Sequence, residues 1–268
     1  MNGGKESHYL KSAFKARIVA REEVAPDHVE LLLSAEELAG ARAGQFCHVL
    51  TPGMLRRPLS FSRIDPKKGE AGILLQVVGS GTAWLYDQHV GEELDLLGPL
   101  GQGFEEPNPE LPWLLVGGGV GIPPLYAALQ SWQASMKEPI AAILGARTAT
   151  AIIMVEDFRE RGIYPLITTD DGSLGRFGTV VGPFVEWMER YPSSQVMACG
   201  PTPMLAALQG AGKVQEGFLQ LCMEQRMGCG VGACLACVVP ARPIGEDGPC
   251  YRRVCTEGPV FHGEELVF

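Results

Sequence analysis

The chain has 268 residues, of which 46% are hydrophobic and 20% charged, and its formal net charge is −9. This composition is typical of a globular protein with a sizeable core, and the acidic balance argues against binding to nucleic acid or to an anionic membrane. The first ten residues lack the basic and then apolar pattern of a signal peptide, so we expect a cytoplasmic protein that does not span a membrane.

Residues 1–105 predict a small antiparallel β-barrel or sandwich. Its segments are short, rich in Val, Leu, Ile and Phe, and separated by Gly, Pro or Asp. The expected strands are Phe14–Val24, His28–Ser34, Gln45–Thr51 and Gly72–Val78.

Two stretches of this β segment could bind phosphate groups. In LRRPLSFSRI, residues 55–64, Arg57 could make a forked contact with a diphosphate, and Ser60 could donate a hydrogen bond to a ring nitrogen. An Arg-Arg pair is also common on a solvated surface, and that alternative stays open. In GSGTAWL, residues 79–85, Thr82 is a candidate N-cap of a short helix that could hold a second phosphate.

From Pro112 onward, apolar strand-like runs alternate with helical stretches. The expected strands are Trp113–Val116, Ile140–Leu144, Leu166–Thr169 and Val196–Ala198, and the expected helices are Pro124–Trp132, Ile153–Arg161, Pro183–Arg190 and Pro203–Gly210. This alternation predicts a doubly wound parallel α/β domain, which we place at residues 106–216. The uncharged run 111–129 contains four glycines and three prolines, which disfavours a membrane span.

Two turns of this domain are candidates for nucleotide binding. LLVGGGVGIPPLYAAL, residues 114–129, has the pattern of a strand, a glycine turn and a helix start, where a phosphate is favoured. It departs from the Rossmann fingerprint at Pro124, which stands where a third glycine is expected but is tolerated in a first helical turn. ACGPTPML, residues 198–205, is a second strand-to-helix turn. A purely structural glycine turn and a merely buried Cys199 are the alternatives.

Six of the eight cysteines follow residue 220, in a region that we place as a separate domain at 217–268. Cys229, Cys234 and Cys237 have the C-x4-C-x2-C spacing of a plant-type 2Fe–2S site. Three glycines of this stretch permit the tight backbone wrap that a cluster needs; they are Gly228, Gly230 and Gly232. A zinc site and reduced, buried thiols are the alternatives. Spacing does not decide whether Cys250 or Cys255 is the fourth ligand.

Taken together, these motifs resemble the ferredoxin–NADP reductase superfamily, which joins a flavin-binding barrel to a nicotinamide domain. The resemblance assigns FAD to the R-P-x-S motif, to the strand before the G-T turn and to that turn: Arg57, Pro58, Leu59, Ser60, Leu74, Leu75, Gln76, Gly81 and Thr82. It assigns NAD to the G-G-x-G-x-x-P and C-G-P motifs: Gly118, Gly119, Gly121, Pro124, Cys199, Gly200 and Pro201.

The C-terminal segments QRMGCGVGACLACVV and VCTEGPVF resemble the electron-transfer subunit of class B dihydroorotate dehydrogenase, and this resemblance runs nearly end to end. Gln225 stands where relatives often have Glu. In that family the last cluster ligand precedes x-x-G-P-V-F, which implies a site of Cys229, Cys234, Cys237 and Cys255.

The resemblance implies an oxidoreductase subunit that passes electrons between NAD, FAD, a 2Fe–2S cluster and an FMN-containing subunit that oxidises dihydroorotate, in an assembly with two copies of each chain. NAD is expected over NADP because Arg147 is the one cation near the second sheet strand, while Glu156 and Asp157 are acidic. The rival functions are a reductase serving ferredoxin, sulfide or another acceptor, and a zinc-stapled binding protein.

Overall fold

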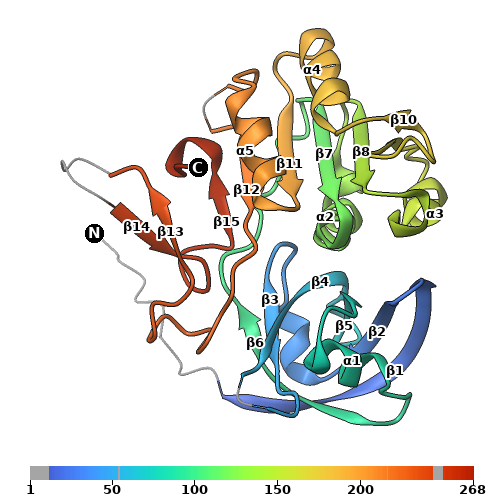
Figure 1. Cartoon of the computed structure of the whole chain (residues 1–268), viewed down its shortest axis with the longest axis vertical. Coiled ribbons are helices and arrows are strands. Elements are labelled where there is room, and N and C mark those ends of the chain that lie inside the picture. Colours follow the sequence, from blue (N-terminus) through green and yellow to red (C-terminus); the bar gives the residue numbers. More distant parts are fainter. Residues whose placement is uncertain (1–11, 54, 216, 244–249) are drawn as a thin grey trace.

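The computed structural model describes residues 12–53, 55–215, 217–243 and 250–268. The first ten residues, examined above for a signal peptide, lie outside these ranges. Figure 1 shows a barrel, an α/β lobe above it, and a C-terminal part along one side of both.

Six antiparallel strands form a closed barrel in the order β1-β2-β5-β4-β3-β6, with β1 pairing with β6 to close it. Their bounds are β1 Ala13–Ala25, β2 His28–Ser34, β3 Phe46–Val49, β4 Arg57–Asp65, β5 Glu70–Gln76 and β6 Glu93–Leu100, and the helix α1 spans Ser80–Tyr86. Alternate side chains of these strands fill the barrel. Ile18, Leu31, Phe61 and Ile73 are fully buried.

The second lobe is a seven-stranded sheet in the order β10-β9-β8-β7-β11-β12-β15, parallel except for β15. The strands are β7 Trp113–Gly118, β8 Ile140–Ala146, β9 Leu166–Thr169, β10 Arg176–Phe177, β11 Gln195–Cys199, β12 Leu219–Cys222 and β15 Val260–His262. The helices are α2 Ile122–Trp132, α3 Val155–Glu160, α4 Val181–Arg190 and α5 Thr202–Gly210. Side chains of α2 and α3 pack on one face of the sheet, and those of α4 and α5 on the other, as in a doubly wound domain.

The C-terminal part contains the cysteine loop and the antiparallel pair β13 (Val238–Ala241) and β14 (Cys250–Arg253). Both β12 and β15 fall within residues 217–268 and yet belong to the α/β sheet. The cysteine loop is therefore anchored to that sheet at both ends. The domain limits 1–105, 106–216 and 217–268 stay predictions.

The uncharged run 111–129 folds as β7, a glycine turn and the start of α2. None of the described helices is both long enough and apolar enough to cross a membrane. Short 3-10 turns connect several elements: Glu36–Gly40, Gly119–Gly121, Gln133–Ser135, Ala149–Ala151 and Gly263–Glu265.

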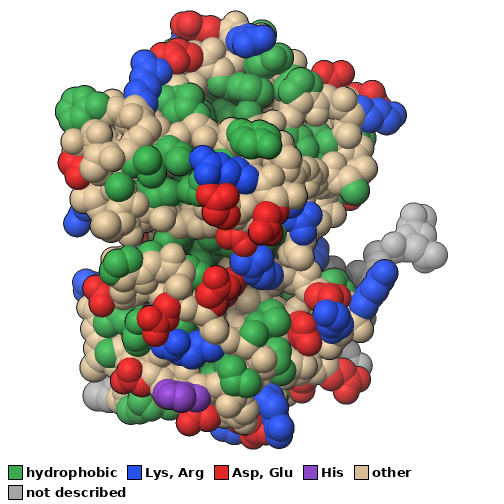
Figure 2. Space-filling view, turned by 90° about the vertical axis from the view of Figure 1, so that its right-hand side faces the viewer, with side chains coloured by type: hydrophobic (Ala, Val, Ile, Leu, Met, Phe, Trp, Pro, Cys, Tyr) green, Lys and Arg blue, Asp and Glu red, His purple; other side chains and the backbone are tan. Residues whose placement is uncertain are grey.

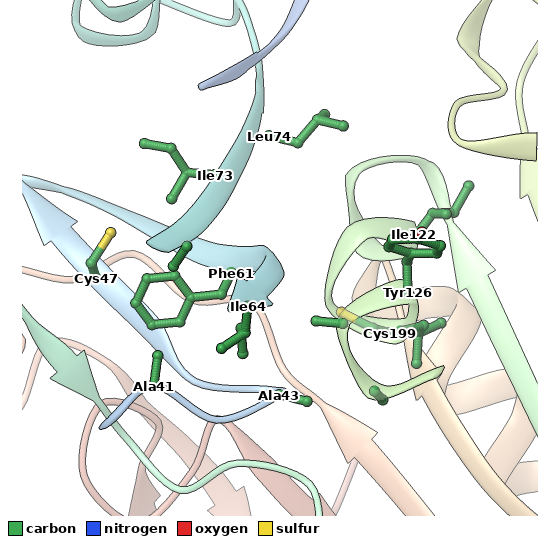
Figure 3. Close-up of a cluster of buried hydrophobic side chains, with 14 of the residues drawn as sticks. Ala41, Ala43, Cys47, Phe61, Ile64, Ile73, Leu74, Ile122, Tyr126 and Cys199 are labelled. Carbon is green, nitrogen blue, oxygen red and sulfur yellow. The ribbon is translucent and has the colours of Figure 1, made fainter. Parts of the chain in front are cut away.

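The barrel and the α/β lobe meet where α2 packs against β4. The backbone N–H of Ile64 donates to Gln130 Oε1 across this contact (3.0 Å), and Figure 3 shows Ile64 on the barrel facing Tyr126 on α2. Arg63 bridges the lobes by pairing with Glu30 of the barrel (2.8 Å) and Asp157 of α3 (2.5 Å). Charged side chains of both signs gather between the two lobes on the face shown in Figure 2, where the surface is hollowed.

Candidate functional site

The two adjacent arginines at the start of β4 have different surroundings. Arg56 pairs with Asp95 (2.5 Å) and donates to the carbonyl of His48. Arg57 Nη1 donates to the carbonyls of Leu55 and Arg56, and no ion pair of Arg57 occurs among the described residues. Arg56 is thus neutralised within the barrel, whereas Arg57 keeps a charge that can meet an anion.

Arg57 packs on the first turn of α1. A Cβ at Gly81 would lie 2.5 Å from Arg57 Nε, so only glycine lets the guanidinium approach this closely. The expectation that Thr82 is the N-cap is wrong, because Gly79 precedes the helix and Thr82 is its third residue. Thr82 Oγ1 instead accepts from the N–H groups of Val78 (2.8 Å) and Gly79 (3.1 Å) and stabilises the turn.

The other residues assigned to FAD lie on β4 and β5. Pro58 and Ser60 pair across the ladder with His48 and Phe46 of β3, so these four side chains share the outer face of the barrel. Leu59 lies between them on β4, and its carbonyl is 3.7 Å from Cys47 Sγ.

On β5, Leu74 lies on the opposite side of the strand from Ile73, toward α2 (Figure 3). Leu75 is buried in the barrel, and Gln76 is exposed at the end of the strand. Pro58 and Ser60 therefore face the C-terminal part, and Leu74 faces the α/β lobe.

The two turns assigned to NAD meet at the carboxyl ends of the neighbouring strands β7 and β11, where Gly117 pairs with Cys199. A Cβ at Gly121 would overlap the carbonyl of Cys199, and a Cβ at Gly200 would lie 3.2 Å from the Cα of Gly118. Pro201 packs against Gly118. Gly119 has a positive φ of +52°, and Pro124 lies in the first turn of α2. The glycines thus allow two backbones to touch, beside the N-terminus of α2.

Cys199 has a partner that the sequence did not reveal. It pairs in register with Cys222 of β12, a strand that was not predicted. The hydrogen bond with the Cys222 thiol and burial both raise the pKa of Cys199 well above its ordinary value, so the group stays a neutral thiol. The apolar run of residues 218–223 was the available signal for this strand.

Glu156 and Asp157, which were expected to favour NAD over NADP, form ion pairs with other residues. Asp157 pairs with Arg63 and Glu156 with Arg159. The acidic residues whose backbone lies beside Ala146 and Arg147 are instead Asp170 and Asp171, in the loop after β9. The N–H of Asp171 donates to the carbonyl of Arg147 (3.2 Å), and the N–H of Ala149 donates to Ser173 Oγ (2.8 Å).

Four cysteine thiols gather in two pairs in the C-terminal part. The Cys229 thiol contacts Cys234, and the Cys255 thiol contacts Cys237. The N–H groups of Val231, Ala233 and Cys234 point at Cys229 Sγ at 3.3–3.4 Å. Burial opposes ionisation, but these donors lower the pKa of Cys229 to about 7, and a thiolate is the form that binds metal.

The structure brings Cys255, and not Cys250, to the other three cysteines. Cys255 Sγ accepts from the N–H of Gly232 (3.2 Å), and the turn that holds Cys255 is closed by the pair of Arg253 with Glu257 (2.8 Å). Cys250 lies at the far end of β14, opposite Ala241. The thiols of Cys255 and Cys237, each almost inaccessible, form the buried side of the site.

These thiols fit a binuclear cluster better than one zinc ion. Zinc takes its ligands around one point, whereas these thiols form two pairs, Cys229 with Cys234 and Cys237 with Cys255. A 2Fe–2S cluster needs two thiols for each of its two irons and is stabilised by N–H groups that donate to sulfur, which is the arrangement found here. Gly230 and Gly232 have φ values of +73° and +81°, as the tight wrap requires.

His48 is a further residue of this region that sequence reasoning missed. It lies on β3 beneath the cysteine loop, and a Cβ at Gly230 would be 2.7 Å from its Nδ1. Burial, assisted by the nearby cation of Arg56, lowers the pKa of His48 to about 4, so the ring is neutral. No spacing rule links residue 48 to residue 230, because tertiary packing alone brings them together.

Comparison with solved structures supports the class of protein that this fold defines. The chain superposes with a TM-score of 0.79 and 30% identity, covering 94% of this chain and 89% of the other, on a chain from a structure titled "Insights into flavin-based electron bifurcation via the NADH-dependent reduced ferredoxin-NADP oxidoreductase structure". It also shares the fold of the ferredoxin reductase in carbazole 1,9a-dioxygenase (TM-score 0.69, 23% identity, 78% and 68% coverage). The protein is thus an oxidoreductase with the fold of the ferredoxin–NADP reductases.

Sequence comparison then identifies the family. Residues 224–267 match the iron-sulfur cluster binding domain of dihydroorotate dehydrogenase B. The chain is 40% identical over 266 residues to the dihydroorotate dehydrogenase B (NAD(+)) electron transfer subunit of Shouchella clausii, covering 96% of this chain and 99% of that protein. The subunit of Geobacillus thermodenitrificans is 39% identical over 259 residues, with 93% and 96% coverage. The chain belongs to the family of dihydroorotate dehydrogenase B (NAD(+)) electron transfer subunits. FAD, a 2Fe–2S cluster and NAD are its cofactors, which excludes the zinc-stapled alternative.

Proposed function

We propose that this chain passes electrons between NAD(H) and an FMN-containing catalytic subunit that converts dihydroorotate to orotate in pyrimidine biosynthesis. Membership in a family of electron transfer subunits implies a catalytic partner. FMN in that partner, two copies of each chain in the assembly and a cytoplasmic location are parts of the proposal. FAD supplies the chemistry that connects hydride transfer from the nicotinamide to one-electron transfer through the cluster.

In the barrel, Arg57 binds the FAD diphosphate, since it pairs with no carboxylate among the described residues and Gly81 leaves room for it. Ser60 donates to the flavin ring, while Thr82 maintains the turn at Val78 and Gly79 that precedes α1. The remaining residues line the ring by backbone and apolar contact; they are Pro58, Leu59, Leu74, Leu75 and Gln76.

In the α/β lobe, the touching glycine turns and the N-terminus of α2 bind NAD. Gly118, Gly119 and Gly121 keep side chains away from the dinucleotide, and Pro124 begins the helix. Cys199, Gly200 and Pro201 form the opposite wall. Asp170 and Asp171 beside Arg147 support NAD over NADP, because a carboxylate disfavours a 2′-phosphate.

In the C-terminal part, Cys229, Cys234, Cys237 and Cys255 hold the cluster. The N–H groups of the loop stabilise charge on the sulfurs. Arg253, paired with Glu257 and close to the thiols of Cys255 and Cys237, adds a positive charge on the same side.

The position of the flavin strand carries this proposal. β5 contacts the Gly119–Gly121 turn and pairs with one edge of β4. The other edge of β4 pairs with β3, which contacts the cysteine loop through His48. The proposed FAD residues therefore lie between the proposed NAD turns and the proposed cluster loop. This order is the one that a two-electron to one-electron relay needs.

The experiment is reconstitution with a purified FMN-containing dihydroorotate dehydrogenase subunit. We expect dihydroorotate-dependent reduction of NAD only when both chains are present. The rival function is a reductase serving ferredoxin or sulfide, and it is favoured if NADH-dependent reduction of ferredoxin is fast while the mixture with the FMN subunit leaves NAD unreduced.

A further inference from the structure

His48 is a buried polar side chain with an imperfect polar partner. Its side chain is fully buried, and its ring nitrogens make no hydrogen bond of good geometry among the described residues, although the backbone of Cys229 lies close enough to interact with the ring. A buried polar group that is incompletely satisfied costs free energy, so such groups are uncommon unless the position serves a function.

The register of the barrel defines where this ring lies. Cys47 and Val49 belong to the core cluster that fills the barrel, so His48 and Phe46 face outward. Phe46 packs in the same apolar cluster as Cys237 and Cys255, and its ring lies edge-on to His48 with centroids 6.4 Å apart. The cysteine loop therefore packs against the outer face of β3.

On this face His48 contacts both neighbouring regions. Its Cα partner on β4 is Pro58, within the proposed flavin motif. Above it, Gly230 approaches so closely that the three atoms nearest to a Cβ there would all belong to the imidazole: Nδ1 at 2.7 Å, Cε1 at 3.1 Å and Cγ at 3.2 Å.

We propose that His48 is a positioning residue that sets the separation of the cluster loop from the flavin strand and thereby the rate of the electron step between them. This inference rests on the proposed placement of FAD at β4 and of the cluster at Cys229–Cys255. In that step one electron leaves the flavin reduced by NADH and is taken up by the oxidised cluster, and no covalent bond to the protein forms or breaks.

The first test compares His48→Ala with Val49→Ala by anaerobic stopped-flow mixing of the holoprotein with NADH. Val49 is the next residue of β3 but faces the barrel interior, so its truncation reports on general loosening of the strand. In His48→Ala we expect flavin reduction within about twofold of the parent rate and the flavin-to-cluster step slower by about tenfold to a hundredfold. Val49→Ala should leave both phases nearly unchanged. Unchanged electron transfer to a fully occupied cluster in His48→Ala would overturn the proposal.

The second test measures the contact itself by the iron content of purified variants. Gly230→Ala should lose iron, because the new methyl group meets the imidazole and because a φ of +73° is strained for alanine. Adding His48→Ala removes the three imidazole atoms that the new methyl group meets. The double variant should therefore regain part of the iron. A double variant with no more iron than Gly230→Ala alone would show that the contact does not shape the loop. A parent protein lacking flavin and cluster absorption would instead refute the proposed function, and this inference with it.

Discussion

At the scale of single residues, the two candidate fourth ligands give the sharpest test of the cluster site. Cys255→Ser should abolish or badly destabilise the cluster, because it removes a thiol that contacts Cys237 and accepts from Gly232 N–H. Cys250→Ser is the matched control, since it makes the same change at the far end of β14. The measurements are iron content and the visible absorption of the cluster.

Both cysteine variants should still transfer hydride from NADH to FAD, because that step does not involve the cluster. Only Cys255→Ser should fail to pass electrons to the partner. Loss of iron from Cys250→Ser with retention in Cys255→Ser would reverse the assignment.

Arg57 is the residue on which FAD retention should depend most. Arg57→Ala removes a charge that forms no ion pair in the described part of the chain, so flavin affinity should fall by about tenfold or more while the fold is kept. Arg17→Ala, an exposed arginine on β1 that pairs with Glu93, is the control. Flavin content after extensive dialysis distinguishes the two. Equal retention in both variants would mean that Arg57 is only a surface charge.

At the scale of elements, the contact of the two nucleotide turns is the feature least tolerant of change. A Cβ at Gly121 would overlap the Cys199 carbonyl, so Gly121→Ala should cost about 1–3 kcal/mol in unfolding free energy and raise the KM for NADH. Gly182→Ala on α4 has nothing within 4 Å of the new Cβ and should be neutral or slightly stabilising. Thermal unfolding and steady-state kinetics check both, and a Gly121→Ala variant with parental KM and stability would contradict the contact.

The elements that the sequence predicted well are those with a strong local pattern. β1, β2, β9 and the helices α2 and α4 lie within a few residues of their expected ranges, because their apolar spacing is regular. β6 was missed although its burial alternates residue by residue, since Gly98 and Pro99 interrupt the run. The strand β12 was missed although residues 218–223 are mostly apolar, and the short strands β13 to β15 have no internal pattern.

The residues of the candidate site also fall into those that sequence could predict and those that it could not. The cysteine spacing and the glycine turns could be found from sequence because their ligands and turns are local. The choice of Cys255 came from family resemblance, and the structure adds its contact with Cys237. His48, Cys222 and the pairing of Arg63 with Asp157 could not be predicted, because each depends on segments joined only by the tertiary fold.

At the scale of the whole molecule, the relative position of the lobes depends partly on Arg63. Its guanidinium pairs with Glu30 and Asp157 and lies over the Tyr126 ring, 5.1 Å from the centroid. Asp157→Asn should lower the unfolding free energy by about 1 kcal/mol, since the pair is partly exposed. It should also slow hydride transfer to FAD, because α3 is then less firmly held to the barrel.

Glu156→Gln is the matched control for that prediction. It lies next to Asp157 on α3 but pairs only with Arg159 of the same helix, at an exposed position. It should change the unfolding free energy by less than about 0.5 kcal/mol and leave hydride transfer unchanged. Equal effects of the two substitutions would show that the pairing between lobes does not position them.

The central claim is that one chain conducts electrons from NADH through FAD to a 2Fe–2S cluster. Its most direct test is an anaerobic titration of the purified chain with NADH, followed by flavin absorption and by electron paramagnetic resonance of the reduced cluster. FAD takes two electrons and the cluster one, so reduction should be complete near about 1.5 NADH per chain, with one cluster signal. Flavin that is bleached while the bound iron–sulfur centre stays oxidised and silent would contradict the account.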